Sequence, residues 1–453
     1  MKKVIWIGLF LCCGMMLAVA QTLNVSETAK LKLFLASESA EPGKKNYQQL
    51  GVQNLETIDW TKVNGLVWNA NGRLDSIKWN DKQLGGSLDI SGFTEIRYIL
   101  CVYNALRPNG IRLENGIKSI DVTGCTNLRY FDCYNNNLTS VDVTTNINLE
   151  WICCRWQNTS LKKIDLTHNP KLYHFCGTGN QFESIDISKN SELRDFFCAA
   201  TLLKKVDVSK NLKLQSVYLR GNQLTELNFS NHPELETLTC YDNQLASLNV
   251  SGCPKLKTVQ AHNNHLKELK IDYMHIDELT CQDNYLTFST LPKLKSWGKF
   301  VYADQKSIIL KVPSNKVDLS SEYRIDGNIT TFFFIEGGSP IEEKEGVFVY
   351  NSSTKNVTIW AVNATSFSGL ILKYNVEFNA AVSVAIPQDI EMYANGNRLY
   401  LRTNCPLTAT VYTILGVVAG QLSVGEGEQM ISLSKGVYIV RLSNGMVRKV
   451  VIQ

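Results

Sequence analysis

Cysteine is the residue type in this sequence whose chemistry stands out first, because thiols form disulfides, bind metals and act as nucleophiles. Thirteen cysteines are present, and six of them recur at one position of a repeated pattern where other copies have Gly177, Leu219 or Ala261. These types share a position only where it faces an apolar interior, and free cysteine behaves as a small hydrophobe. We therefore interpret the six as buried, reduced filler: Cys101, Cys133, Cys154, Cys198, Cys240 and Cys281.

Cys153 and Cys176 break this rule, because each precedes the inward position by one residue. They are expected to point outward on adjacent strands, about one strand spacing apart. One interpretation is a disulfide between them, and the other is a pair of exposed or partly shielded thiols. Cys125 and Cys253 occupy another repeated position, mostly asparagine elsewhere, and lie six units apart, so they cannot pair with each other.

Other residues with catalytic or metal-binding chemistry do not form a recognisable pattern. His262 and His265 have a metal-like spacing, but no third ligand is in register with them. Asp132, Asp195 and Asp242 are scattered without the paired, buried partner that acid-base catalysis requires. No GxSxG, HExxH or phosphate-binding glycine loop occurs. We expect no enzyme activity, no cofactor and no metal.

A repeat with a spacing of mostly 21 residues must position all of these side chains. One turn of a coil buries its apolar side only when the next turn stacks on it, so the pattern predicts a solenoid. Nine short parallel strands at about 4.8 Å per step would give an arc of about 40 Å. The units begin at Leu88, Ile120, Val141, Ile164, Ile185, Val206, Leu227, Leu248 and Leu269.

An asparagine is the polar exception within the apolar pattern of each unit. Its amide has two donor hydrogens and an acceptor oxygen, which can satisfy backbone groups where the chain leaves each strand. We expect these side chains to form a column: Asn104, Asn136, Asn180, Asn222, Asn243, Asn264 and Asn284.

The repeat pattern LxxLxCxxNxL resembles that of leucine-rich repeats. The stretches AKLKLFL, WTKVNGLVWN and GGSLDISG within 29–90 resemble the N-terminal segment of leucine-rich repeat surface proteins from Bacteroidetes-type bacteria. The DLSS and SGLILK segments resemble an immunoglobulin-like module of those proteins, and LSKGVYIVRL with the closing RKVVIQ resembles a C-terminal sorting domain. The last resemblance implies that the type IX secretion machinery is a partner and that the tail directs outer-membrane passage.

The expected fold class is a repeat solenoid with little helix, followed by two small all-β sandwich domains. Strand-like segments with glycine turns after the repeats support the two sandwiches. The expected boundaries are 1–20 for a signal peptide, 21–87 for a helical and degenerate-repeat cap, 88–292 for about nine repeats, 298–380 for the immunoglobulin-like domain and 384–453 for the sorting domain.

The N-terminus indicates export. Lys2 and Lys3 precede an apolar run over 4–19 and a small-residue cleavage site after Ala20. A lipid-anchored Cys12 is the alternative, but Leu11 stands where a small residue would be needed. No later stretch approaches the roughly 18 to 20 apolar residues of a membrane span. The net charge of +4 on 453 residues implies no nucleic-acid partner. We expect the protein at the cell surface or outside the cell.

The outward strand positions are expected to form a concave binding face rich in aromatic and cationic residues, which dominate binding hot spots. The expected function is non-enzymatic binding of a protein or glycan, and the alternatives are an adhesin or internalin-like attachment factor and a structural spacer. β-Propensity alone is the other explanation of the aromatics. The expected contact residues are Tyr98, Tyr130, Tyr134, Trp151, Arg155, Trp156, His174, Phe197, Tyr218, Arg220 and Tyr241.

Overall fold

The structure is a computed structural model. It describes residues 22–105, 113–114, 116–157, 161–272, 276–292, 299–367, 370–378, 391–403, 406–413, 418–425, 427–443 and 447–452. The expected signal peptide over 1–20 lies outside the described residues. The chain forms two compact units, and the first comprises Met1–Ser307 with Ile325–Thr330 and Val362–Leu372.

A short helical segment precedes the repeats. Helix α1 (Val25–Ala36) begins at Asn24, whose side chain accepts a hydrogen bond from the Glu27 backbone N–H at 3.0 Å. Helix α2 (Asn46–Gln49) and a short 3₁₀ helix (Trp60–Lys62) follow. The buried Glu27 carboxylate accepts hydrogen bonds from Arg73 at 2.7 Å and from the Leu74 N–H at 2.8 Å, so α1 is tied to the first coil. No described helix has the length and apolarity needed to cross a membrane.

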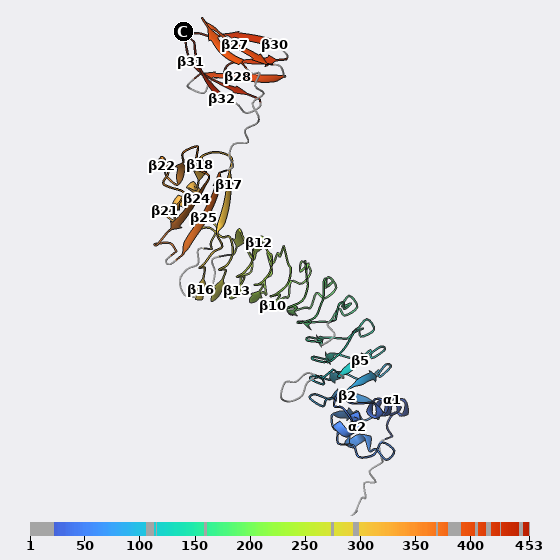
Figure 1. The fold of residues 1–453 in the computed structure, drawn as a ribbon. Helices are drawn as coiled ribbons and strands as arrows, with labels where there is room; N and C mark the ends of the chain where they lie inside the picture. Colours follow the sequence, from blue (N-terminus) through green and yellow to red (C-terminus); the bar gives the residue numbers. More distant parts are fainter. Residues whose placement is uncertain are drawn as a thin grey trace, which may run out of the picture. The chain divides into compact units, whose positions relative to one another are not determined.

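The solenoid is built on a twelve-stranded sheet in the order β1-β2-β4-β6-β7-β8-β9-β10-β11-β13-β15-β16. β1 and β2 are antiparallel, and successive pairs from β2 onward are parallel and in register. Figure 1 shows these strands along the inner side of the curved solenoid. The strands are β1 Leu66–Trp68, β2 Leu74–Lys78, β4 Tyr98–Leu100, β6 Tyr130–Asp132, β7 Trp151–Cys153, β8 His174–Cys176, β9 Asp195–Phe197, β10 Ser216–Tyr218, β11 Thr237–Thr239, β13 Thr258–Gln260, β15 Glu278–Thr280 and β16 Lys299–Val301.

Two details of the strands differ from the expectation. The repeat pattern places one strand over 238–240, but β11 begins and ends one residue earlier, so it is centred on Leu238 and Cys240 follows its last residue. The parallel sheet also continues past residue 292, because β16 pairs with β15. The side chain of Gln305 then donates to the Cys281 carbonyl at 2.9 Å, as an asparagine does in earlier coils. A further coil therefore follows the nine that the repeat pattern reveals.

The repeated cysteines occupy the interior, which confirms their interpretation as filler. All six are free and buried. Burial raises the pKa of Cys240, Cys198 and Cys281 to about 12, because a thiolate is poorly solvated inside the solenoid. These thiols are therefore protonated at neutral pH and act as small apolar groups.

An asparagine column joins successive coils next to the sheet, and this confirms its expected role. Asn264 donates from Nδ2 to the Cys240 carbonyl at 3.0 Å and to the Ala261 carbonyl at 3.1 Å, and its Oδ1 accepts from the Leu245 N–H at 3.0 Å. One side chain thus satisfies backbone groups of two neighbouring coils. Asn180, Asn222 and Asn243 make the same contacts, and Gln157 replaces asparagine in one coil.

A second column lies on the side of the coils away from this sheet. The side chains of Asn146, Asn169, Asn190 and Asn211 each donate to two buried backbone carbonyls at 2.9 to 3.0 Å. Cys125 takes this position where the Ile90 N–H also bonds to the Asp121 carbonyl, and its thiol donates to the Ile90 carbonyl at 3.1 Å. A thiol at this position therefore bonds one carbonyl where the backbones of two neighbouring coils are already hydrogen-bonded to each other. In the coils with asparagine, the side-chain amide supplies the hydrogen bonds to the backbone carbonyls instead.

The second unit contains the C-terminal β-structure. One sheet has the order β17-β25-β24-β21 and another β18-β23-β22, whereas most of the short pair β19-β20 lies in the segment 325–330 that belongs to the first unit. Their bounds are β17 Ile308–Val312, β18 Lys316–Asp318, α3 Ser320–Tyr323, β19 Arg324–Ile325, β20 Asn328–Ile329, β21 Thr331–Glu336, β22 Glu342–Lys344, β23 Val347–Val349, β24 Asn356–Val362 and β25 Ile371–Phe378. Phe348 packs its ring against Phe332 and Phe334 across the two sheets.

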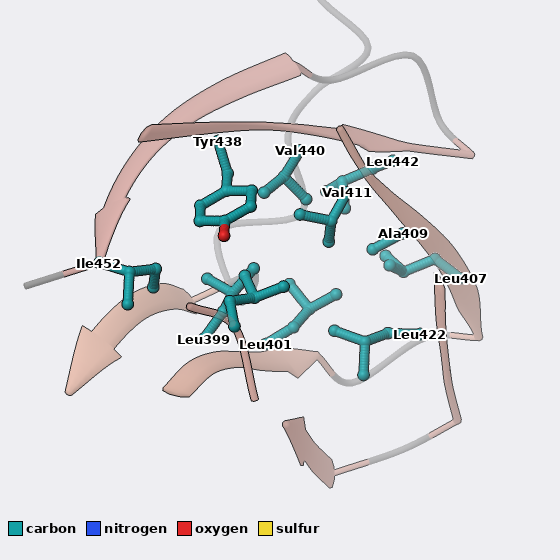
Figure 2. Packing of buried hydrophobic residues seen from close by; sticks show 11 residues of the cluster. Leu399, Leu401, Leu407, Ala409, Val411, Leu422, Tyr438, Val440, Leu442 and Ile452 are labelled. Carbon is teal, nitrogen blue, oxygen red and sulfur yellow. The ribbon is translucent and has the colours of Figure 1, made fainter. Parts of the chain in front are cut away.

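The last segment forms two further antiparallel sheets, β26-β27-β30 and β29-β28-β31-β32. Figure 2 shows their apolar side chains pointing toward one another, including Leu401, Val411 and Val440. The strands are β26 Glu391–Asn395, β27 Arg398–Thr403, β28 Leu407–Thr413, β29 Val418–Val424, β30 Gly427–Ser432, β31 Gly436–Leu442 and β32 Val447–Ile452. The fold class expected from the sequence, a solenoid followed by all-β structure, is confirmed.

The second column gives a stability prediction within one coil. Asn146→Ala removes the donor of two buried carbonyls, whereas Asn148→Ala removes a solvent-exposed bond to the Thr126 carbonyl. We expect the first change to lower the free energy of unfolding by about 2 kcal/mol and the second by less than about 0.5 kcal/mol. Urea unfolding followed by circular dichroism measures both. Equal losses would contradict the role of the column.

Candidate binding surface on the inner face of the solenoid

The inner face has three rows of side chains, and the expected contact residues divide among them. The first strand residues supply Tyr98, Tyr130, Trp151 and His174, and the third strand residues supply Phe197 and Tyr218. The row that follows the strands by two residues contains Tyr134, Arg155, Arg220 and Tyr241. The expectation that all eleven residues lie on strands is therefore wrong for this third row and for Trp156, because the strands from β4 to β11 in this sheet have only three residues each.

The first two rows form a continuous column of aromatic rings, called here the aromatic column. The rings of Tyr130 and Trp151 stack at a centroid distance of 4.0 Å and an angle of 6°, and Trp151 stacks on His174 at 4.7 Å and 10°. His174 meets Phe197 edge to face at 5.2 Å, and Phe197 meets Tyr218 in the same way at 4.9 Å. In-register parallel strands bring equivalent positions of successive coils together, which explains the stacking.

Stacking also determines which parts of these rings a ligand can reach. The faces of Tyr130, Trp151 and His174 are turned toward one another, and all three residues are half-buried. Their edges are what remains for contact.

Trp156 lies in the turn after β7 rather than on the strand. Its φ of +52° is in the left-handed region, which is unusual for a bulky residue. The next coil has Gly179 at the equivalent position, where a Cβ atom would lie 2.5 Å from Cε3 of the indole. The indole therefore requires glycine beneath it, and 38% of Trp156 stays exposed.

The third row contains two arginines that stack on tyrosines. The Arg155 guanidinium lies 4.1 Å from the Tyr134 ring centroid, and Tyr134 in turn meets Tyr103 at 4.6 Å. The Arg220 guanidinium lies 5.8 Å from the ring centroid of Tyr241. Such cation-π contacts hold a guanidinium in place while its N–H groups stay available.

His174 and Asp195 form a contact that the sequence-based reasoning missed. His174 Nδ1 lies 3.1 Å from Asp195 Oδ2, so Asp195 has an imidazole neighbour that the sequence-based reasoning did not identify. The sequence could have predicted this contact, because the two residues are 21 positions apart and this separation brings the first residues of β8 and β9 side by side. Among the described residues no hydrogen bond joins the imidazole to the Cys176 thiol on the same strand, so this pair orients the ring within the aromatic column.

Cys153 and Cys176 are register partners on β7 and β8. Both are free thiols and lie in the second row of the inner face, as expected, but both are buried, so the expectation that they are exposed or only partly shielded is wrong. A hydrogen bond between the two side chains lowers the pKa of the Cys176 thiol and raises that of Cys153. The disulfide between them stays a prediction.

Asp132 is the acid with the most perturbed environment on this face. Burial beside the aromatic column raises the pKa of its carboxyl to about 6, although Oδ1 accepts a hydrogen bond from the Tyr134 N–H at 3.1 Å. Asp242 differs, because it accepts a hydrogen bond from the Asn263 side chain at the surface. In the described part of the chain, no three His, Cys, Asp or Glu side chains are grouped so that they could hold a metal ion.

Comparisons with known proteins concern the fold. No family model and no curated protein matches the chain. Among solved structures it is similar to the functional domain of InlJ from Listeria monocytogenes, which includes a cysteine ladder, with 20% identity and a TM-score of 0.47 over 65% of this chain and 69% of that one. It is also similar to an internalin of the same bacterium, with 15% identity and a TM-score of 0.36 over 46% of this chain and 62% of that one. A leucine-rich repeat protein of Leptospira interrogans is similar with 16% identity and a TM-score of 0.33 over 49% of this chain and 73% of that one.

The raised pKa of Asp132 predicts how stability depends on pH. The folded chain binds this proton more tightly than the unfolded chain, whose carboxyl has a pKa near the ordinary value of 3.8, so the ionised carboxylate destabilises the fold as pH rises from about 4 to 6. We expect Asp132→Asn to be more stable than the natural protein by about 1 to 3 kcal/mol at pH 7.5, and equally stable near pH 4. Urea unfolding across this range measures the difference.

Asp142→Asn is the matched control with the opposite sign. The exposed Asp142 accepts hydrogen bonds from the Thr144 N–H at 3.0 Å and its hydroxyl at 2.7 Å, which lower the pKa of the carboxyl. Its contribution is present above the ordinary pKa and is lost as the pH falls through the folded-state pKa. The Asp142→Asn variant should therefore be less stable than the natural protein at pH 7.5. The same sign for both variants would contradict the assignment.

These observations together define the chain by its fold. Its in-register parallel strands, inward apolar positions and asparagine column make the first unit a parallel β-solenoid, the fold class of the leucine-rich repeat proteins to which it is similar.

Proposed function

We propose that this protein is a non-enzymatic, exported binding protein that recognises a protein partner through the inner face of its solenoid. The observation that carries the proposal is the aromatic column, which runs over five successive coils from Tyr130 to Tyr218. Aromatic residues and arginine are enriched in binding hot spots, and the rigid rings of tyrosine and tryptophan bury much area at little entropic cost.

A protein suits this surface better than a glycan. Sugar rings bind to open aromatic faces, but the faces of Tyr130, Trp151 and His174 stack on one another. The exposed ring edges, such as those of Tyr98 and Tyr218, offer hydroxyl groups beside apolar carbon, and protein interfaces combine these two kinds of contact.

The test is binding to arrays of extracellular proteins and glycans. We expect saturable binding to a protein, and Trp151→Ala should weaken it by about thirty-fold, since loss of a hot-spot residue costs at least about 2 kcal/mol. Trp360→Ala is the control, because Trp360 is a half-buried tryptophan on β24, outside the solenoid face. Saturable binding to glycans alone, or binding that ignores Trp151, would refute the proposal, and no saturable binding at all would favour the spacer.

We also propose that the protein reaches the cell surface through a signal peptide over 1–20 and a C-terminal sorting domain over 384–453. The support is the sequence pattern of both ends, together with the compact β-structure of the tail. An attachment role toward host tissue would be one use of such a surface protein.

Deletion of 384–453 tests this delivery. We expect the truncated protein to be missing from the surface fraction and to accumulate inside the cell envelope, as shown by fractionation and immunoblotting. The full-length Trp151→Ala protein, which keeps the tail, is the control and should be delivered normally. Unchanged surface delivery of the truncated protein would remove the sorting role.

A further inference from the structure

Cys153 and Cys176 are thiols of the inner face, and they are register partners on the adjacent parallel strands β7 and β8. In-register residues of neighbouring parallel strands have Cα atoms about 4.8 Å apart. This separation lies within the range of about 4.4 to 6.8 Å that disulfides span. Both side chains also leave the sheet on the same face, because each is the third residue of its strand. The backbone therefore already has the geometry that a bond between the two sulfur atoms requires.

The two thiols differ in how readily they lose a proton. A hydrogen bond from the Cys153 thiol lowers the pKa of the Cys176 thiol below its ordinary value, although burial acts in the opposite direction. The positive charges of Arg155 and His174 add to the decrease. The thiolate is the form of cysteine that attacks a disulfide. Cys176 is therefore the nucleophile of the pair, and Cys153 is the second thiol within its reach.

The interior cysteines lack this reactivity. Cys133 and Cys154 also lie on adjacent coils, but burial raises the pKa of both thiols well above the ordinary value. They stay protonated at neutral pH, and a protonated thiol is a poor nucleophile. Of the described cysteines, Cys176 is the one whose pKa is lowered. Thiol chemistry in the described part of the solenoid is thus directed to the inner-face pair.

The location of the pair allows a bond to form early and then persist. Arg155, His174 and the two thiols all lie on the coils of β7 and β8, so the reactive thiolate exists as soon as these two strands pair. In the complete solenoid Cys153 is 5% exposed and Cys176 is 4% exposed. Because exchange depends on access to the sulfur atoms, a disulfide at this position would be shielded from reductants.

We propose that Cys153 and Cys176 form a disulfide that joins β7 to β8 within the aromatic column, by exchange with a small disulfide of the oxidising compartment that the exported chain enters. The proposal rests on the export that is part of the proposed function, because disulfides persist in such compartments. The bond would fix the relative positions of Trp151 and His174, which stand two residues before the cysteines on the same strands.

The exchange has two steps. The Cys176 thiolate attacks one sulfur of the small disulfide, the S–S bond breaks, and a mixed disulfide forms while the first small thiolate leaves and takes up the proton that Cys176 lost. The Cys153 sulfur then attacks Cys176 Sγ, and its proton passes to the second small thiolate as that group leaves. The two cysteines are oxidised by two electrons, and the small disulfide is reduced to two thiols.

The experiment uses the full-length protein, unfolded in urea with dithiothreitol and refolded in a mixture of reduced and oxidised glutathione. A parallel sample is refolded with dithiothreitol. Both are alkylated with N-ethylmaleimide in urea, digested with trypsin and analysed by mass spectrometry. Trypsin releases Cys153 within 130–155 and Cys176 within 172–189. We expect these peptides to be linked in the first sample, with the mass of two hydrogens lost, and to be separate and alkylated in the second.

Substitutions identify the partner of Cys176, because the peptide 130–155 also contains Cys133 and Cys154. Cys153→Ala should abolish the link. Cys154→Ala is the matched control, because it removes the neighbouring interior thiol at a position where another coil has Ala261, and it should retain the link. Circular dichroism of each variant checks that the fold is retained.

Three results would overturn the inference. The first is complete alkylation of Cys153 and Cys176 after oxidising refolding. The second is a link that survives Cys153→Ala, since Cys176 would then have another partner. The third is a link that Cys154→Ala abolishes in a variant that keeps its fold.

Failure of this inference is distinguishable from failure of the proposed function, because refolding in vitro requires neither export nor a ligand. Thiols that stay free in the oxidising mixture overturn the disulfide and leave the proposed function standing. Loss of surface delivery or of binding that depends on Trp151 is measured on other samples, and it refutes the proposed function without changing the result of refolding.

Discussion

Every coil of this solenoid leaves backbone groups in the interior that no strand pairing can satisfy, and the whole first unit depends on how they are bonded. The asparagine column near the sheet solves this problem with one side chain per coil, as Asn264 does for backbone groups of two neighbours. Because the amide must reach both coils, it fixes their spacing and register. The parallel strands, and with them the rows of the inner face, follow from that register.

The inner face is a direct product of the same register. Stacking of equivalent positions turns single residues of each coil into the aromatic column, the Cys153 and Cys176 pair and the third row. Three neighbouring strands thus combine an imidazole bonded to Asp195, a half-buried carboxyl at Asp132 and two facing thiols. The electrostatic properties of this region come from contacts between residues of neighbouring coils, and no single repeat contains all of these residues.

The periodicity of the sequence was sufficient to predict the solenoid, the interior cysteines and the asparagine column, because inward positions are set by a pattern of residue types. It could not predict features that depend on whether a strand is one residue longer or shorter. Trp156 lies in a turn because each strand has three residues, and the two buried thiols are covered by neighbours that no pattern identifies. The contact of His174 with Asp195 was readable only by comparing residues 21 apart, one coil from the next.

Coil-by-coil register also has a consequence for how such a surface changes over generations. Distances between side chains on the inner face can take only whole multiples of one strand spacing, about 4.8 Å. Loss or duplication of the coil that carries Ala199 would shift Arg220 relative to Arg155 by one such step while leaving every buried contact type in place. Unequal recombination between repeats would therefore change the distances between side chains on the inner face only in discrete steps of one strand spacing.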